Sequence, residues 1–213
     1  MSPRTDVHGS DPGAAGAALD RLLRAQRAIS RAGAWIGGTL LFASVGLIAT
    51  EVVLRKLFTT TLHGAHELSA YAFAIVVSWG FAYALFEKAH IRIDVAYVRL
   101  PRAGRIGLDL IALLSLAILS GLMSWGAWGV LSGSLERGST ANTPLETPLW
   151  IPQTLWLIGM VWFTLAILTL MLRTLVAVGE RDPGSAQAHA GSPTLEDEIR
   201  AEAPDAAIGG GER

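Results

Sequence analysis

The chain has 213 residues, of which 51% are hydrophobic and only 16% are charged, with a formal net charge of −1. It contains no cysteine, which excludes disulfides and thiolate metal sites. The small net charge does not indicate a partner, because residues of opposite charge are gathered into separate clusters along the chain.

The gaps between these clusters determine the class of protein. Four windows contain no Asp, Glu, Lys or Arg: Ala32–Thr50, Leu68–Phe86, Leu110–Leu135 and Thr147–Leu172. Each is long enough to cross a bilayer as a helix. A soluble fold would lack the polar chain needed to cover four such helices. The sequence therefore predicts an all-α integral membrane protein with four transmembrane helices, at about 32–54, 67–86, 109–135 and 148–172.

The N-terminal region precedes these spans and has two parts. Residues 1–18 are rich in Gly, Ala, Ser, Asp and Pro, which predicts a disordered leader. Residues 19–31 carry arginines three or four positions apart, at Arg21, Arg24, Arg27 and Arg31. This spacing suits a basic amphipathic segment at the lipid headgroups, and equally a solvated extension of the first span.

The basic residues also predict an orientation. The N-terminal segment holds five Lys or Arg residues, and the next three loops hold two, five and one. By the positive-inside rule, both termini and the second loop are expected in the cytoplasm. We expect this loop to form a short interfacial helix before Pro101, although its alternating apolar residues also resemble a strand. The membrane domain is expected to cover 32–178, with a disordered tail at 179–213.

The second span carries most of the candidate contact residues. Small residues recur every four positions, a pattern that lets another helix approach closely: Ala70, Ala74, Ser78 and Ala82. Glu67 lies in the first helical turn, where the helix dipole favours a carboxylate, and Tyr71 follows one turn later. The helix dipole alone would explain the position of Glu67, and the alternative is that Glu67 and Tyr71 make a polar contact with a partner subunit.

A polar cluster follows the second span, with His90, Arg92 and Asp94 as its candidate members. It would serve either as a solvated loop or as a network that holds the loop. His63 and His66 precede the span and face the opposite surface, so they cannot bind one metal together with His90. The sequence shows no catalytic motif, and we expect neither an enzyme nor a cofactor or metal site.

These features together resemble a known family. Val52–Phe58 closes the first span, Glu67–Tyr71 opens the second, and His90–Asp94 follows it. The last loop and span are marked by Gly138–Thr140, Pro148–Trp150 and Gly159. Over about residues 32–175 the chain resembles the small membrane subunit, the DctQ-like component, of tripartite ATP-independent periplasmic (TRAP) transporters.

The resemblance implies a role in transport. It implies a multi-pass protein of the bacterial inner membrane that scaffolds a large permease subunit. A periplasmic solute-binding protein would deliver the solute, commonly an organic acid, for sodium-coupled symport. The lipid bilayer is the remaining partner, and no nucleic acid is expected. The alternatives are a four-helix subunit of a membrane enzyme or electron-transfer complex, and an unrelated four-span structural protein.

Overall fold

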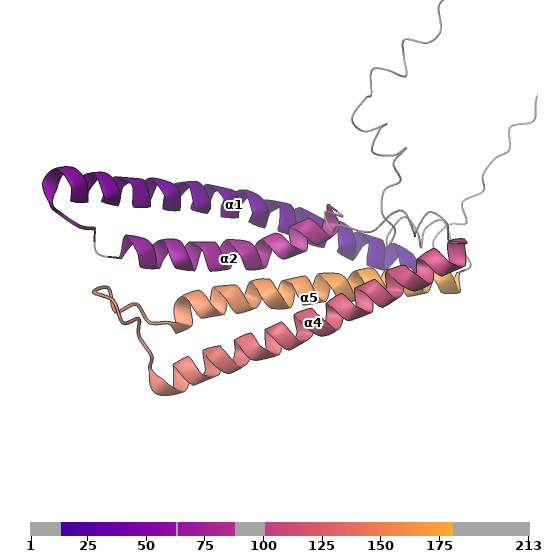
Figure 1. The fold of residues 1–213 in the computed structure, drawn as a ribbon. Helices are drawn as coiled ribbons and strands as arrows, with labels where there is room; N and C mark the ends of the chain where they lie inside the picture. The colour runs from indigo at the N-terminus through magenta and orange to yellow at the C-terminus, as the bar shows by residue number, and fades with distance from the viewer. Residues whose placement is uncertain (1–13, 63, 88–100, 181–213) are drawn as a thin grey trace, which may run out of the picture.

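The computed structural model describes residues 14–62, 64–87 and 101–180 (Figure 1). These residues form four α-helices and no strand: α1 (Ala14–Phe58), α2 (Ala65–Phe86), α4 (Arg102–Arg137) and α5 (Trp150–Gly179). Each helix is long and apolar enough to cross a membrane. The predicted all-α fold with four membrane-spanning helices is confirmed.

The helices form two hairpins that lie side by side. Figure 1 shows α1 beside α2 and α4 beside α5, with α2 and α5 in the middle of the bundle. Residues 59–62 and 64, between α1 and α2, lie together with the connection 138–149 at one end, which we call the connection end. At the opposite end, the terminal end, α1 begins and α5 stops. There α1 extends past α2 and packs directly against α5.

Helix α1 is longer than one membrane span. Its 45 residues extend about 68 Å at 1.5 Å per residue, more than twice the hydrocarbon thickness of a bilayer. The helix includes residues 14–18, which the sequence assigns to a leader, and it runs through the basic segment 19–31 without a break. Ala, Leu and Arg dominate this stretch and are strong helix formers, so the helix has no local reason to stop.

Local backbone chemistry sets the other helix boundaries. Helix α1 ends before Thr59, whose φ is +53°, and α2 begins after Gly64, whose φ is +99°. Helix α4 follows Pro101 and ends at Gly138, whose left-handed backbone lets its N–H bond to the carbonyl of Leu135.

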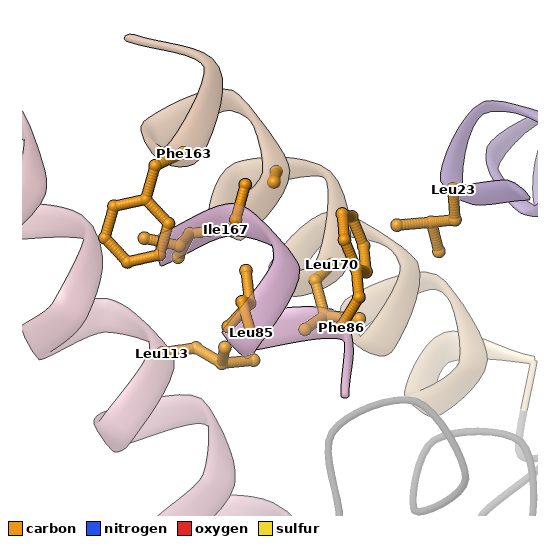
Figure 2. Packing of buried hydrophobic residues seen from close by; sticks show 9 residues of the cluster. Leu23, Leu85, Phe86, Leu113, Phe163, Ile167 and Leu170 are labelled. Carbon is orange, nitrogen blue, oxygen red and sulfur yellow. The ribbon is translucent and has the colours of Figure 1, made fainter. Parts of the chain in front are cut away.

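All four helices contribute to one apolar core near the terminal end. Figure 2 shows Leu85 and Phe86 of α2 packed among side chains of α5, with one leucine each from α1 and α4 alongside. The contributing residues from the other helices are Leu23, Leu113, Phe163, Ala166, Ile167 and Leu170. This core joins the two hairpins and fixes the depth of α1 relative to α5.

The middle of the bundle depends on close approach between α2 and α5. A Cβ atom added at Gly159 of α5 would lie 2.4 Å from the Ser78 hydroxyl oxygen and 2.8 Å from a ring carbon of Trp79. No side chain larger than hydrogen fits there without a shift. Gly37 of α1 is similarly close to α2, because a Cβ there would lie 3.0 Å from Val76.

Candidate functional site

The connection end contains a polar site built around Glu67. Glu67 lies in the first turn of α2 and is only 9% exposed, although it is charged. One carboxylate oxygen accepts a hydrogen bond of 2.8 Å from the Tyr71 hydroxyl, one helical turn on. The other accepts a hydrogen bond from the hydroxyl of Thr143, which belongs to the connection between α4 and α5. Glu67 therefore ties this connection to the start of α2.

The connection between α4 and α5 is folded so that it can reach α2. Thr140 and Pro148 form an antiparallel bridge, and the N–H of Ala141 bonds to the carbonyl of Thr147 at 2.9 Å. These contacts close the loop and leave Thr143 and Leu145 near its tip. Leu145 packs so closely on Gly64 that a Cβ there would lie 1.9 Å from its nearest methyl carbon. Only glycine is compatible with both this contact and the positive φ of that position.

The four small residues predicted on α2 have different environments. Ser78 and Ala82 are buried against the rest of the chain, with Ser78 directly against Gly159. Ala70 and Ala74 are exposed. Ser78 and Ala82 are thus used for packing within the chain, whereas Ala70 and Ala74 form the open half of the row.

A second polar site joins α1 and α5 at the terminal end. The Arg173 guanidinium donates to both carboxylate oxygens of Asp20, at 2.7 and 3.2 Å. Arg173 is only 2% exposed. Sequence analysis did not identify this pair, since Arg173 stands just beyond an uncharged window and Asp20 lies among arginines. Asp20 reaches Arg173 because α1 continues as a helix alongside the end of α5.

Glu51 was also missed by the sequence analysis. It is 8% exposed and directly follows the uncharged window of α1. One of its carboxylate oxygens is fully buried and accepts no hydrogen bond from any residue that the structure describes. A buried carboxylate oxygen without a donor is unfavourable. In this respect Glu51 differs from Glu67 at the connection end, both of whose carboxylate oxygens accept hydrogen bonds.

The remaining polar candidates take no part in the two polar sites described above. His90, Arg92 and Asp94 fall outside the described residues, as does the expected interfacial helix after the second span. His66 is described and is exposed at the start of α2.

The open space between α1 and α2 is apolar. One groove, of about 210 Å³, is lined by residues of α1, α2 and α5: Gly33, Ile36, Gly37, Leu40, Ile75, Val76, Trp79 and Leu155. A second, of about 350 Å³, continues from Leu40 and Ile75 toward the connection end. Binding an ionised substrate requires several converging polar groups, which this lining lacks. The grooves suit hydrocarbon.

Comparison with known families agrees with this architecture. The family model described as "Tripartite ATP-independent periplasmic transporters, DctQ component" matches residues 44–177. The chain belongs to the DctQ family. The match covers the second half of the first membrane span in α1, all of α2 and α4, the loop that holds Thr143, and nearly all of α5. Comparisons with curated proteins and with solved structures give no match.

Membership has direct consequences for the class of protein. A DctQ protein is a membrane component of a transporter and not an enzyme. It works with a large permease subunit and with a periplasmic binding protein, which agrees with the kinds of partner that the sequence resemblance implied. The basic segment before residue 44 lies outside the match.

Proposed function

We propose that this chain is the scaffold subunit of a TRAP transporter for sodium-coupled uptake of an organic acid. The chain would hold a large permease in position in the bacterial inner membrane and would move no solute itself. The observation that carries this proposal is the family match over residues 44–177, in a chain whose four spans have central windows without a charged residue.

The polar contacts support a scaffold. Transport of an ion or a carboxylate through the bilayer generally requires ionisable groups within the spans. In the described part of this chain, the buried ion pair Asp20–Arg173 and the Glu67 site lie near the ends of the bundle and bind other parts of the same chain. They are engaged in holding four helices in one arrangement, which leaves apolar outer faces for lipid and for a partner.

The basic residues support an orientation with both termini in the cytoplasm. In this arrangement the connection end, with Glu67 and Thr143, faces the periplasm. A reporter fused after Arg181 is expected to signal a cytoplasmic position, and one inserted near Thr140 a periplasmic position. The reverse result at either site would contradict this orientation.

Reconstitution tests the scaffold role. We expect liposomes that contain this chain alone to show no sodium-driven uptake, whereas the chain with its permease and binding protein restores it. Omission of this chain from the complete mixture should abolish uptake. Uptake by the chain alone, or full uptake without it, would overturn the proposal.

The open half of the small-residue row offers a test of permease contact. Ala74 is exposed within the chain, so Ala74→Leu should leave the isolated chain stable and weaken its co-purification with the permease. The control is Ala112→Leu, at an exposed alanine on α4. Equal co-purification of both variants would show that Ala74 is not at the contact.

A further inference from the structure

The N-terminal part of α1, Ala14–Arg31, forms an arm that lies along α5. Three polar contacts fix its position. Besides the Asp20–Arg173 pair, Gln26 donates to the Thr169 hydroxyl at 3.3 Å, and the Trp162 indole N–H donates to the Ser30 hydroxyl at 3.1 Å. Together they run along α5 from residue 162 to 173.

These contacts set the depth of the arm in the membrane. Helix α5 carries no charge from Trp150 to Leu172, so its stretch beside the arm belongs to the apolar span and its edge. The arm therefore lies at the boundary between hydrocarbon and headgroups and does not project freely into water. Side chains at this boundary contact lipid headgroups.

The arm presents two different flanks at this depth. Its contact face is buried at Leu23, Gln26 and Ser30. On one flank lie the exposed arginines, which recur at spacings of three and four: Arg21, Arg24, Arg27 and Arg31. On the other, Leu22 and Ile29 are each nearly half exposed and stand seven residues apart. An apolar flank and a basic flank on one helix are typical of interfacial segments.

The charges of the arginines are weakly compensated by the protein. Arg31 approaches Glu87 only to 3.8 Å, and both side chains are exposed. Arg27 stacks over the Phe86 ring at 5.8 Å. The Arg21 and Arg24 guanidinium groups contact carbonyls of their own helix at 3.4 Å. Among the described residues no carboxylate pairs with Arg21, Arg24 or Arg27, since Asp20 is engaged by Arg173.

We propose that this basic flank binds the headgroups of anionic phospholipids. Guanidinium groups offer several donors in a planar arrangement that matches phosphate oxygens. At this depth the lipid phosphate groups provide the negative charge that can pair with the arginines. A headgroup with a net negative charge attracts the arginines more strongly than a zwitterionic one. Bound lipid would hold the arm on α5 and anchor the bundle at its terminal end.

Native mass spectrometry of the purified full chain tests this inference. Phosphatidylglycerol is added in parallel with phosphatidylcholine, and the number of lipids retained is compared. We expect the wild type to retain phosphatidylglycerol preferentially. In the variant Arg21→Gln/Arg24→Gln/Arg27→Gln we expect the preference to fall by roughly fivefold per arginine at low salt.

The other end of the molecule provides the matched control. Arg55→Gln/Lys56→Gln/Arg137→Gln also removes three exposed positive charges, but at the connection end. This variant should keep the preference, as should Arg21→Lys/Arg24→Lys/Arg27→Lys in large part. The melting temperature in phosphatidylcholine verifies that each variant is folded.

Three results would overturn the inference. The wild type could show no preference for phosphatidylglycerol, which would make the flank a solvated surface or a site for an acidic protein. The arm variant could retain the full preference. The two glutamine variants could lose it equally, which would show an effect of total charge and no site on the arm.

Discussion

The two ends of the bundle are joined by different kinds of polar contact. At the terminal end, Asp20 and Arg173 both belong to long helices, and their ion pair links α1 directly to α5. At the connection end, Glu67 belongs to α2, but its partner Thr143 belongs to a loop. The first contact fixes one helix against another, whereas the second fixes a loop on a helix.

This difference predicts different consequences when each contact is removed. Two helices that separate expose packed side chains along their length, so the whole fold loses stability. A loop that detaches exposes little apolar surface, so the loss is local.

Removal of the Asp20 carboxylate is expected to be the most harmful. Asp20→Asn leaves the Arg173 guanidinium buried beside a neutral group, and loss of one partner of a buried pair is strongly destabilising. We expect the free energy of unfolding in mixed micelles to fall by about 3 kcal/mol, at the low end for buried pairs because Asp20 is 28% exposed.

An exposed ion pair on the same arm is the control for this variant. Arg31→Gln breaks the contact with Glu87, whose side chain is 41% exposed, and should change stability by less than about 1 kcal/mol. Replacement of the buried pair by Asp20→Leu/Arg173→Met should restore part of the loss. Equal effects of Asp20→Asn and Arg31→Gln would refute the distinction between the two pairs.

The close approach of α2 and α5, midway between the ends, should give the next largest effect. Gly159→Ala places a methyl group against Ser78 and Trp79, and the helices must move apart at a cost of about 1–2 kcal/mol. Gly129→Ala on α4 is the control, because a Cβ there meets nothing within 4 Å. That variant should gain up to about 1 kcal/mol from helix propensity. Changes of the same sign in both variants would contradict the packing described.

The sequence predicted the helices well because their signal is local. An uncharged window of membrane length predicts a span from composition alone, and each of the four windows falls on one helix, except for the first residues of the last. Hydropathy does not show where a helix ends beyond its apolar part. The structure extends α1 back to Ala14, and Asp20, Gln26 and Ser30 in the added stretch contact α5.

The polar contacts could be predicted only in part. Sequence reasoning placed Glu67 and Tyr71 on one helical face, but Thr143 is 76 residues from Glu67 and carries no recognisable signal. Asp20 and Arg173 are 153 residues apart. A period of four residues predicts one continuous row on α2, whereas the structure buries only Ser78 and Ala82 of that row. Which part is covered depends on the path of α5.

Loss of the Glu67 charge should have a local effect. Glu67→Gln keeps the size of the side chain but weakens the bonds from Tyr71 and Thr143, because a neutral amide oxygen is a poorer acceptor than a carboxylate. We expect faster hydrogen exchange in residues 138–149, with a smaller change in global stability than either variant above. Glu146→Gln changes an exposed glutamate in the same loop and should leave exchange unaltered. If Glu67→Gln instead unfolds the whole protein, the polar contacts at the two ends are equally important for the stability of the fold.

Glu51 gives the smallest expected effect, and one of opposite sign. It is as buried as Glu67, yet one of its oxygens accepts no hydrogen bond from the described residues. Removing its charge should therefore relieve an unfavourable burial instead of breaking a contact. We expect Glu51→Gln and Glu51→Met to leave the melting temperature of the isolated chain unchanged or to raise it. The two substitutions separate charge from hydrogen bonding, because glutamine keeps an acceptor and methionine does not. If both substitutions instead lower the melting temperature, the Glu51 carboxylate accepts a stabilising hydrogen bond when the chain is in the membrane. Glu51 would then resemble Glu67.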